Sequence, residues 1–488
     1  MPVRPAFLAL AAAVASFLVF IPSLFHGWLS WDDPIMVSMN PHIRGFVWDQ
    51  LKWAFTSSPT GAYQPLAYLS YGLDFTFWGL DPRGYHLTSV LLHALNAALV
   101  FLVSRRLLSL CVPQGRGEAA WSLDAAALSA ALVFALHPLR VESVSWVAER
   151  RDPLCGIFWL GAILSYLRAR RPGGPSRSLI QVHALFAAAC LAKGVAVTLP
   201  LVLLVMDVWP LRRRLVDSVA EKIPMLVLGG ALGILAVWQQ SGARAAWAWS
   251  DHGLAVRLAQ MAYALVFYVR KTLWPSGLSP FYELRPPLDP LEARFLFCAA
   301  VVASFVAASW RWRRQRPWLA AAGAAYAIIL LPLSGIMQAG AQLVADRYSY
   351  LSCLVWALLF GAAFRAGLRR ARLAALASAV AVILPLAATC VAQQSHWRDS
   401  QSLWLRTLAL DPDSPTAWLN LGAEWARKGS TTQAVDAFRR ALAADPACPP
   451  LVERLSSLVE RGDIDAAELL NVRAGLKTRP VCRKALAD

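Results

Sequence analysis

The sequence predicts an all-α protein, namely a polytopic membrane bundle of about 11 transmembrane helices followed by a soluble helical domain. Of the 488 residues, 57% are hydrophobic and only 16% are charged, whereas soluble domains carry about a quarter charged residues. Apolar runs long enough to cross a bilayer recur along the chain. Short arginine clusters separate them, so the net charge of +17 indicates membrane orientation rather than a nucleic-acid surface. This composition excludes a soluble enzyme, a disordered protein and a small disulfide-stabilised module.

The predicted spans follow from runs of roughly 20 apolar residues, some of them shortened by polar flanks. They are 6–26, 86–110, 123–137, 152–169, 178–192, 194–210, 223–240, 293–310, 317–334, 349–366 and 372–391. Arginine clusters follow alternate spans, at 105–106, 168–177, 212–214, 311–316 and 365–372. The positive-inside rule makes their side cytoplasmic. We therefore expect an inner (plasma) membrane protein with a cytoplasmic N-terminus and a C-terminal segment on the outer, periplasmic side.

Three amphipathic stretches do not count as spans. Residues 255–274 are apolar, but Arg257, Gln260, Arg270 and Lys271 interrupt them, so we predict a helix lying in the membrane interface. Residues 43–56 and 65–79 are too polar to span and rich enough in aromatic residues to lie on a bilayer surface. Both belong to a long first outer loop, 28–85.

The tail beyond the last span has the pattern of a tetratricopeptide repeat. The matches to its 34-residue spacing are Trp418, Leu421, Gly422, Trp425, Ala434, Phe438, Ala441 and Pro446. Trp404 and Pro412 fit the second half of an earlier repeat, and Pro480 fits a degenerate capping repeat. We predict a membrane domain at 1–392 and a repeat domain at 393–488. Two roles stay open for the repeats, a structural cap or a groove that docks an acceptor protein.

Ionisable residues near the apolar core indicate a functional site. Placing such a residue there costs free energy, so it is expected to form an ion pair or to have a function. Asp32 and Asp33 follow the first span on the outer face, and two adjacent carboxylates raise the pKa of one of them unless a cation lies near. The same face receives several cations and polar side chains, namely Arg44, Tyr63, Gln64, His86, His137, Arg140, Glu142, Arg151, Lys193, Asp346 and Arg347. We predict that they form one pocket at the membrane rim.

The order of these motifs resembles a known family. The motifs are WDDP at 31–34, YQPL at 63–66, the run 81–97, the run 134–156, LAKGVAVTLP at 191–200, LVMDVWPL at 204–211, 271–282, ADRYSYL at 345–351 and 396–408. Over nearly its whole length the chain is similar to bacterial relatives of the transmembrane and tetratricopeptide-repeat O-mannosyltransferases. The resemblance implies a GT-C fold and a glycosyltransferase that moves a sugar, a hexose such as mannose, from a polyprenyl-phosphate donor to a Ser or Thr hydroxyl of an envelope or secreted protein outside the cytoplasm.

Physical chemistry then assigns roles to the residues of this expected pocket. Asp32 or Asp33 is the base that takes the acceptor proton. Arg347 and Lys193, followed by His137, Arg140 and Arg151, stabilise the departing lipid phosphate. Glu142 and Asp346 orient these cations, and the supporting substrate-binding residues are Arg44, Tyr63, Gln64 and His86. An alternative role for the carboxylate pair is to hold Mg²⁺ or Mn²⁺, although no metal-ligand motif occurs and metal-free catalysis is favoured.

Two other classes of function remain as rivals. The first is a non-catalytic membrane scaffold whose repeats recruit envelope-assembly proteins. The second is a transporter of lipid-linked sugars, which should carry ionisable or helix-breaking residues at mid-span in both halves. The polar residues here gather at one rim instead, which favours the transferase. Besides the donor, the acceptor and membrane lipids, no nucleic-acid partner is expected.

Overall fold

The computed structural model describes residues 3–111, 121–171, 175, 177–242, 253–285, 287–336 and 340–444, and most of them are helical. A helix lies in every range predicted to span the membrane. These helices are α1 (Val3–Val19), α4 (Pro82–Cys111), α5 (Trp121–Ala135), α7 (Arg151–Ala169), α8 (Arg177–Ala192), α9 (Leu199–Val208), α11 (Ile223–Gly242), α13 (Ala293–Arg311), α14 (Pro317–Leu330), α16 (Leu354–Arg370) and α17 (Arg372–Gln394). The helical character that the sequence predicted is confirmed for the described residues.

Length and composition single out fewer helices as membrane-spanning than the sequence predicted. Among the described residues, three are long and apolar enough, namely Pro82–Cys111, Ala293–Arg311 and Arg372–Trp397. The number rises to five if two bent pairs of helices, which begin at Trp121 and at Asp346, each count as one span. Five further apolar helices are shorter. A count of 11 crossings therefore remains a prediction.

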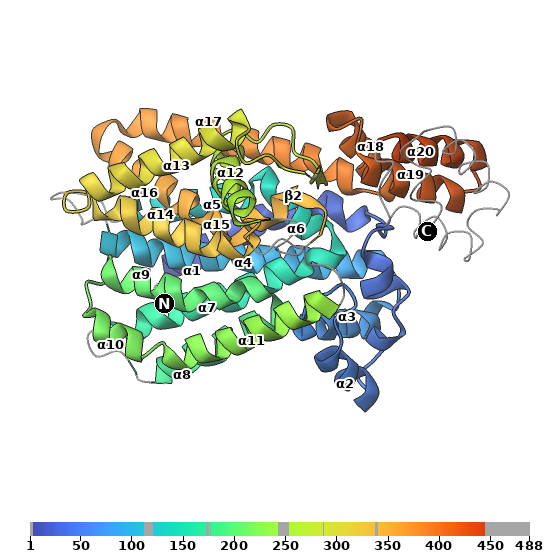
Figure 1. The fold of residues 1–488 in the computed structure, drawn as a ribbon. Coiled ribbons are helices and arrows are strands. Elements are labelled where there is room, and N and C mark those ends of the chain that lie inside the picture. Colours follow the sequence, from blue (N-terminus) through green and yellow to red (C-terminus); the bar gives the residue numbers. More distant parts are fainter. Residues whose placement is uncertain are drawn as a thin grey trace.

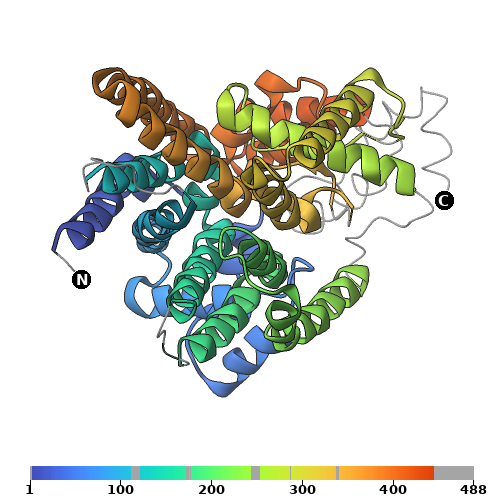
Figure 2. The same cartoon turned by 90° about the vertical axis from the view of Figure 1, so that its left-hand side faces the viewer.

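The basic connections lie together at one end of the bundle. Figure 1 shows the connections α9–α10, α13–α14 and α16–α17 at the end opposite the C-terminal helices. These connections hold three of the arginine clusters, at 212–214, 311–316 and 365–372. Seen from that end, the long helices of the described part lie beside one another, and no sheet lies between them (Figure 2). Three of the five predicted arginine clusters thus lie at the same end of the bundle.

Small residues let the central helices approach closely, as they do in membrane bundles. A methyl group at Gly361 of α16 would lie 2.7 Å from the carbonyl oxygen of Ala126 in α5. Polar side chains also link the helices across this core. The amide of Asn96 in α4 donates to the carbonyl of Pro153 in α7 (2.7 Å), and His93 bonds to the Tyr350 hydroxyl at 2.8 Å.

Short elements connect the long helices, and a few of them, among them η6, η8 and β2, line the cavity described below. They comprise α2 (Trp48–Thr56), α3 (Pro65–Trp78), α6 (Val141–Ser145), α10 (Leu215–Ala220) and α15 (Ser349–Ser352), together with η1 (Ile21–Phe25), η2 (Pro34–Ser38), η3 (Pro41–Ile43), η4 (Pro138–Arg140), η5 (Val147–Arg150), η6 (Gly194–Thr198), η7 (Leu331–Leu333), η8 (Asp346–Tyr348) and η9 (Ser395–Trp397). Strands β1 (Tyr282–Glu283) and β2 (Gln342–Val344) pair antiparallel. Helices α2 and α3 occupy the two stretches predicted to be amphipathic.

Helix α12 (Leu254–Leu273) matches the stretch predicted to lie in the interface. It is seen nearly end-on in Figure 1 and lengthwise in Figure 2, so it runs across the direction of the long helices. It is not among the helices that meet the length and composition requirements for a span. Its polar residues Arg257, Gln260 and Lys271 are buried against the protein. Whether 255–274 lies in the membrane interface stays a prediction, because several helices predicted to cross do not meet these requirements either.

The described part of the tail consists of α18 (Ser400–Leu410), α19 (Pro415–Arg427) and α20 (Thr431–Ala444). Helices α19 and α20 pack as a pair, with Leu421, Ala434, Phe438 and Ala441 buried. A methyl group at Gly422 would lie 2.6 Å from the Phe438 ring, which explains the glycine at this close contact. Pro446 and Pro480 lie outside the described residues, so the length of a repeat array is untested.

The tail packs against the bundle through several polar contacts. The backbone N–H of Ser30 donates to the Ser400 hydroxyl (2.8 Å). The hydroxyls of Ser414 and Thr416, at the start of α19, donate to the Glu283 carboxylate at 2.5 and 2.8 Å. Since Glu283 lies in β1, and β2 contributes to the candidate site described below, the tail is attached to the wall of that site.

Candidate active site

A cavity of about 470 Å³ lies near the end of the bundle that carries the tail. Its lining includes the carboxylate of Asp32 and the cations Arg151, Lys193 and Arg347. The aromatic residues of the lining include Trp31, Tyr63, Trp146, Phe281 and Tyr348. Trp31, Asp32 and Tyr63 come from the segment 28–85, and Trp146 and Arg151 come from the segment that leads into α7. Phe281 precedes β1, Lys193 lies at the α8–η6 junction, and Arg347 and Tyr348 belong to η8. The structure therefore brings together Asp32, Tyr63, Arg151, Lys193 and Arg347, as the sequence predicted.

The carboxylate of Glu149 connects the three cations. Arg151 donates to its two oxygens at 3.0 and 2.7 Å, and Lys193 Nζ donates at 2.5 Å. The guanidinium of Arg347 lies 3.6 Å away. Burial alone raises the pKa of Glu149, but the three cations lower it well below its usual range. One buried negative charge thus holds three positive charges beside the cavity.

A second partner positions Arg347. Its guanidinium forms an ion pair with Glu142, and its backbone N–H donates to the same carboxylate at 2.8 Å. The other guanidinium nitrogen donates to Gln342 Oε1 of β2 (2.8 Å). Glu142 therefore holds Arg347 in place, and its role in a reaction stays a prediction.

Lys193 and Arg151 are each held by a second partner too. Lys193 Nζ donates to Asp152 at 2.7 Å, and Arg151 donates to Gln64 Oε1 at 3.0 Å. Gln64 is buried and bridges Arg151 to the first outer loop, so it supports a cation instead of lining the cavity. Each cation is thus fixed from two sides, which is the preorganisation that binding of an anion needs.

The two adjacent aspartates have different environments. Asp33 is fully buried, and its two oxygens accept hydrogen bonds from the backbone N–H groups of Leu29 (2.8 Å) and Ala148 (3.0 Å). Burial raises the pKa of Asp33 to about 7. Asp32 is half-buried and lines the cavity. Only Asp32 is therefore oriented to meet a substrate, whereas Asp33 ties the loop that carries it to η5.

Aromatic rings form the wall beside Asp32. Trp31 stacks on Trp146 with ring centroids 4.4 Å apart and planes 16° from parallel. Trp31 also contacts Trp404 of the tail at 5.3 Å and Phe281 at 5.8 Å. Because Arg347 lies over both Trp31 and Trp146, the cation cluster and the aromatic wall share one surface of the cavity.

Two residues predicted to bind the donor phosphate do not reach the cavity. His137 caps η4 by accepting from the backbone N–H of Leu139, and its other ring nitrogen bonds to the carbonyl of Thr272 at 3.0 Å. Arg140 is buried and donates to the carbonyl and hydroxyl of Ser349 at 3.0 and 2.7 Å. Both side chains are engaged in joining η4 to α12 and α15, so we correct their role to a structural one.

Three of the supporting residues also lie elsewhere. Asp346 accepts a hydrogen bond from the Tyr282 hydroxyl (2.8 Å) and therefore fixes β1, whereas the contacts to Arg347 come from Glu142 and Glu149. His86 is buried with its ring against His26, and Arg44 is exposed. None of the three lines the cavity.

Sequence reasoning missed Glu149, Trp31 and Trp146 as site residues. The only local signal for Glu149 was an acidic residue before two arginines, a pattern that exposed loops also show. Trp31 precedes the aspartate pair, but with 21 tryptophans in the chain its ring resembled a membrane anchor. Their place at the cavity depends on contacts between segments that are far apart in the sequence, such as Glu149 with Lys193 and Trp31 with Trp146.

The residues around Asp32 do not fit a cation site built on two carboxylates. Both oxygens of Asp33 already accept backbone hydrogen bonds and point away from the cavity. Within the described part of the chain, no cluster of three His, Cys, Asp or Glu side chains is arranged to hold a metal ion. We therefore derive no step through a metal.

Comparison with known proteins relates the chain to O-mannosyl-transferases. It is 24% identical to the protein O-mannosyl-transferase TMTC4 of Mus musculus in an alignment that is 495 residues long with its gaps. The alignment covers 90% of this chain and 66% of the relative. It is 31% identical to the protein O-mannosyl-transferase Tmtc2 of Drosophila melanogaster over 296 residues, 56% of this chain and 30% of the relative. The chain thus matches between about a third and two thirds of the length of these relatives.

Two further comparisons were made. No protein-family model matches the chain. Among solved structures, ArnT from Cupriavidus metallidurans bound to undecaprenyl phosphate aligns with 91% of this chain and 75% of its own, at 16% identity and a TM-score of 0.40. The sequence relatives alone support the expected resemblance to transmembrane O-mannosyltransferases.

Proposed function

We propose that this protein is an inner-membrane glycosyltransferase of the GT-C type that transfers a hexose such as mannose from a polyprenyl-phosphate donor to a Ser or Thr hydroxyl. One observation carries the proposal, the cavity in which Asp32 shares its walls with Arg151, Lys193 and Arg347. The reaction needs a carboxylate beside the acceptor hydroxyl and cations beside the leaving phosphate, and the cavity offers both. The names of the sequence relatives agree with it.

The reaction is a single displacement at the anomeric carbon of the sugar. The acceptor oxygen forms the new bond to that carbon while the bond from the carbon to the phosphate oxygen breaks. Asp32 takes the hydroxyl proton, because a hydroxyl becomes an effective nucleophile only as its proton leaves. Attack from the face opposite the phosphate inverts the anomeric configuration.

The leaving group is the lipid phosphate, and its oxygen gains negative charge as the bond breaks. Arg151, Lys193 and Arg347 stabilise that charge, and Glu149 and Glu142 keep all three from reorienting. The stacked rings of Trp31 and Trp146 offer an apolar surface for the sugar and exclude water from the anomeric carbon. Asp33 acts as a positioning residue for the loop that carries Asp32.

The membrane arrangement belongs to the same proposal. About 11 crossings place the arginine-rich end in the cytoplasm and the cavity on the periplasmic side, where lipid-linked sugars and exported proteins meet. The tail, a tetratricopeptide-repeat array, lies on that side beside the cavity. Its contact with β1 supports a role in presenting the acceptor protein.

The test is transfer by the purified full-length protein in lipid nanodiscs. A short-chain polyprenyl phosphate-mannose and a Ser/Thr-rich peptide serve as substrates, and mass spectrometry detects a hexose added to the peptide. We expect Asp32→Asn to lower the turnover by a factor of about 100 to 10,000, the usual contribution of a general base. The folding of this variant should be unchanged, because the side chain faces a cavity.

Asp49→Asn is the matched control, since Asp49 is an exposed aspartate in α2 that does not line the cavity. It should retain wild-type turnover. Normal transfer by Asp32→Asn would remove Asp32 from the mechanism, and lack of transfer by the wild type with any lipid-phosphate sugar would favour the scaffold. A transporter would instead move the donor across vesicle membranes without modifying the peptide.

A further inference from the structure

A second cavity lies at the arginine-rich end of the bundle, away from the candidate active site. Its volume is about 520 Å³. One wall consists of Leu204, Val205 and Val208 of α9, and the other consists of Ala320, Ala321 and Ala324 of α14. We call it the α9–α14 groove. The small alanines keep the groove open and the side chains on both walls are apolar, which suits a hydrocarbon chain.

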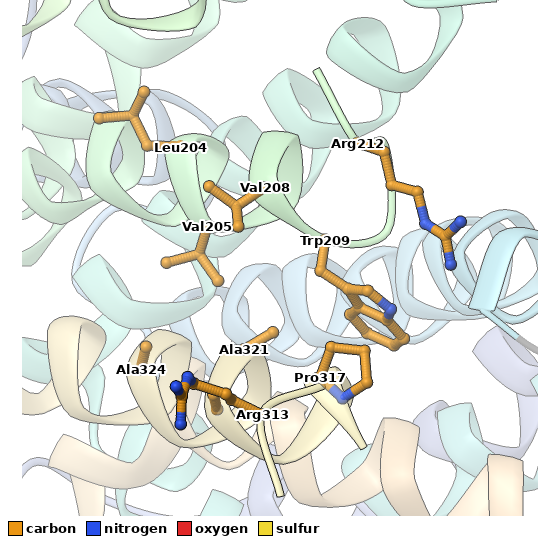
Figure 3. Close-up of a pocket in the computed structure, with 10 residues that line it drawn as sticks. Leu204, Val205, Val208, Trp209, Arg212, Arg313, Pro317, Ala321 and Ala324 are labelled. Carbon is orange, nitrogen blue, oxygen red and sulfur yellow. The ribbon is translucent and has the colours of Figure 1, made fainter. Parts of the chain in front are cut away.

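Two arginines accompany this groove. Figure 3 shows Arg212 and Arg313 on either side of Trp209 and Pro317 at the groove. No aspartate or glutamate occurs among its described lining residues. The guanidinium of Arg313 stacks 4.1 Å from the Trp310 ring and donates to the Trp310 carbonyl, which keeps it close to the apolar surface. The groove thus combines an apolar wall with cationic flanks.

The local backbone directs neighbouring arginines to different places. Arg213 donates to Glu221 at 2.8 and 2.6 Å and lies 3.3 Å from Asp207, so its charge is neutralised inside the protein. Arg212 has a φ of 51°, which is uncommon for a residue with a side chain. Arg212 lines the groove, whereas Arg213 pairs with Asp207 and Glu221.

Aromatic residues indicate how this end meets the bilayer. Trp310 is 69% exposed, and Trp312 and Trp318 are 42% and 36% exposed. Exposed tryptophans at a helix end are typical of the headgroup level of a membrane. The arginines of the groove then lie at the depth of lipid phosphates, and the walls formed by α9 and α14 lie at the depth of the acyl chains.

We propose that the α9–α14 groove is a binding site for an anionic phospholipid of the surrounding bilayer. An acyl chain lies between the two helices, and the anionic headgroup lies at the end of the groove that Arg212 and Arg313 flank. The charge of the flanks and the lack of acidic lining residues favour an anionic headgroup over a zwitterionic one. This site is separate from the proposed transfer reaction and does not depend on it.

Native mass spectrometry of the detergent-purified full-length protein tests this site. Phosphatidylglycerol and phosphatidylcholine are titrated separately, and the wild type should prefer phosphatidylglycerol. The variant Arg212→Gly with Arg313→Gln should weaken phosphatidylglycerol binding by about tenfold or more, on the basis of the attraction of each arginine to an anionic headgroup. Glycine accepts the φ of residue 212, so this variant keeps the fold.

Arg214→Gln with Arg314→Gln is the matched control, because it removes two charges from the same connections outside the groove. It should retain phosphatidylglycerol binding. Ala324→Phe fills the apolar part without changing the charge and should lose binding. The proposal is overturned if the control weakens binding as much as the groove variant, if Ala324→Phe binds normally, or if phosphatidylcholine binds equally well. A dimer that disappears in Ala324→Phe would assign the groove to a second copy instead.

Discussion

Replacing Glu149 by Gln removes one negative charge from beneath three cations while keeping the size of the side chain. Lys193 and Arg151 lie 2.5 to 3.0 Å from its oxygens, and Arg347 lies 3.6 Å away. At an effective dielectric constant of about 20, one such pair at about 3 Å is worth roughly 5 kcal/mol before desolvation. Because each cation keeps a second partner, we expect a net loss of about 3–5 kcal/mol, the cost of breaking one buried pair.

Thermal unfolding of the detergent-purified protein, followed by tryptophan fluorescence, measures this change, and the peptide transfer assay measures its consequence. Glu149→Gln should unfold several degrees below the wild type and transfer at least about tenfold more slowly, because displaced cations stabilise the leaving phosphate less well. The matched control is Glu221→Gln, whose carboxylate binds two arginines at the opposite end but is partly exposed. It should lose about 1 kcal/mol or less. Equal stability and transfer for the two variants would refute the role of Glu149.

Three further outcomes follow from the structure. Burial raises the pKa of Asp33 from 3.8 to about 7, so its contribution to stability is full below about pH 4 and is lost as the pH rises to about 7. The stability advantage of the wild type over Asp33→Asn should therefore shrink by up to about 1.4 kcal/mol per pH unit in that window, and a constant difference in denaturant unfolding would contradict this. Glu283→Ala removes the acceptor of the Ser414 hydroxyl, so hydrogen exchange in α19 should accelerate while the bundle stays protected; unchanged exchange would show that the tail is held elsewhere. Gly422→Ala drives a methyl group to 2.6 Å from the Phe438 ring and should destabilise the tail by about 1–3 kcal/mol, and an unaltered melting profile would argue against the close pairing of α19 and α20.

Much of the fold could be predicted because its signals are local. A helix lies in every predicted apolar range, and another helix covers the stretch 255–274, whose place in the membrane interface stays a prediction. Of the residues that fit the repeat spacing, Leu421, Gly422, Ala434, Phe438 and Ala441 are buried, whereas Trp418 and Trp425 are half-buried. Hydropathy and helical periodicity act within a few turns of the chain, so they can be read before any tertiary contact is known.

The site could be predicted only in outline. The prediction that Asp32 lies near Lys193 and Arg347 rested on placing all three at one rim of the membrane, and the structure places them around one cavity. The sequence did not predict that Asp32 lines the cavity while Asp33 is buried. That difference depends on the hydrogen bonds that Asp33 accepts from the backbone N–H groups of Leu29 and Ala148. The same limit applies to Glu149, whose importance comes from the convergence of three separate segments.

The sequence by itself was enough to predict three features of the chain. It predicted that the chain forms apolar helices, that the basic connections share one end, and that the motifs share the opposite end. Only the tertiary structure decided that His137 and Arg140 join elements together while Arg151, Lys193 and Arg347 surround one carboxylate. Hydrophobic burial depends on composition and period, which any stretch of sequence carries in itself. The direction of a polar side chain depends on partners that other segments supply, and those partners exist only after the helices have packed.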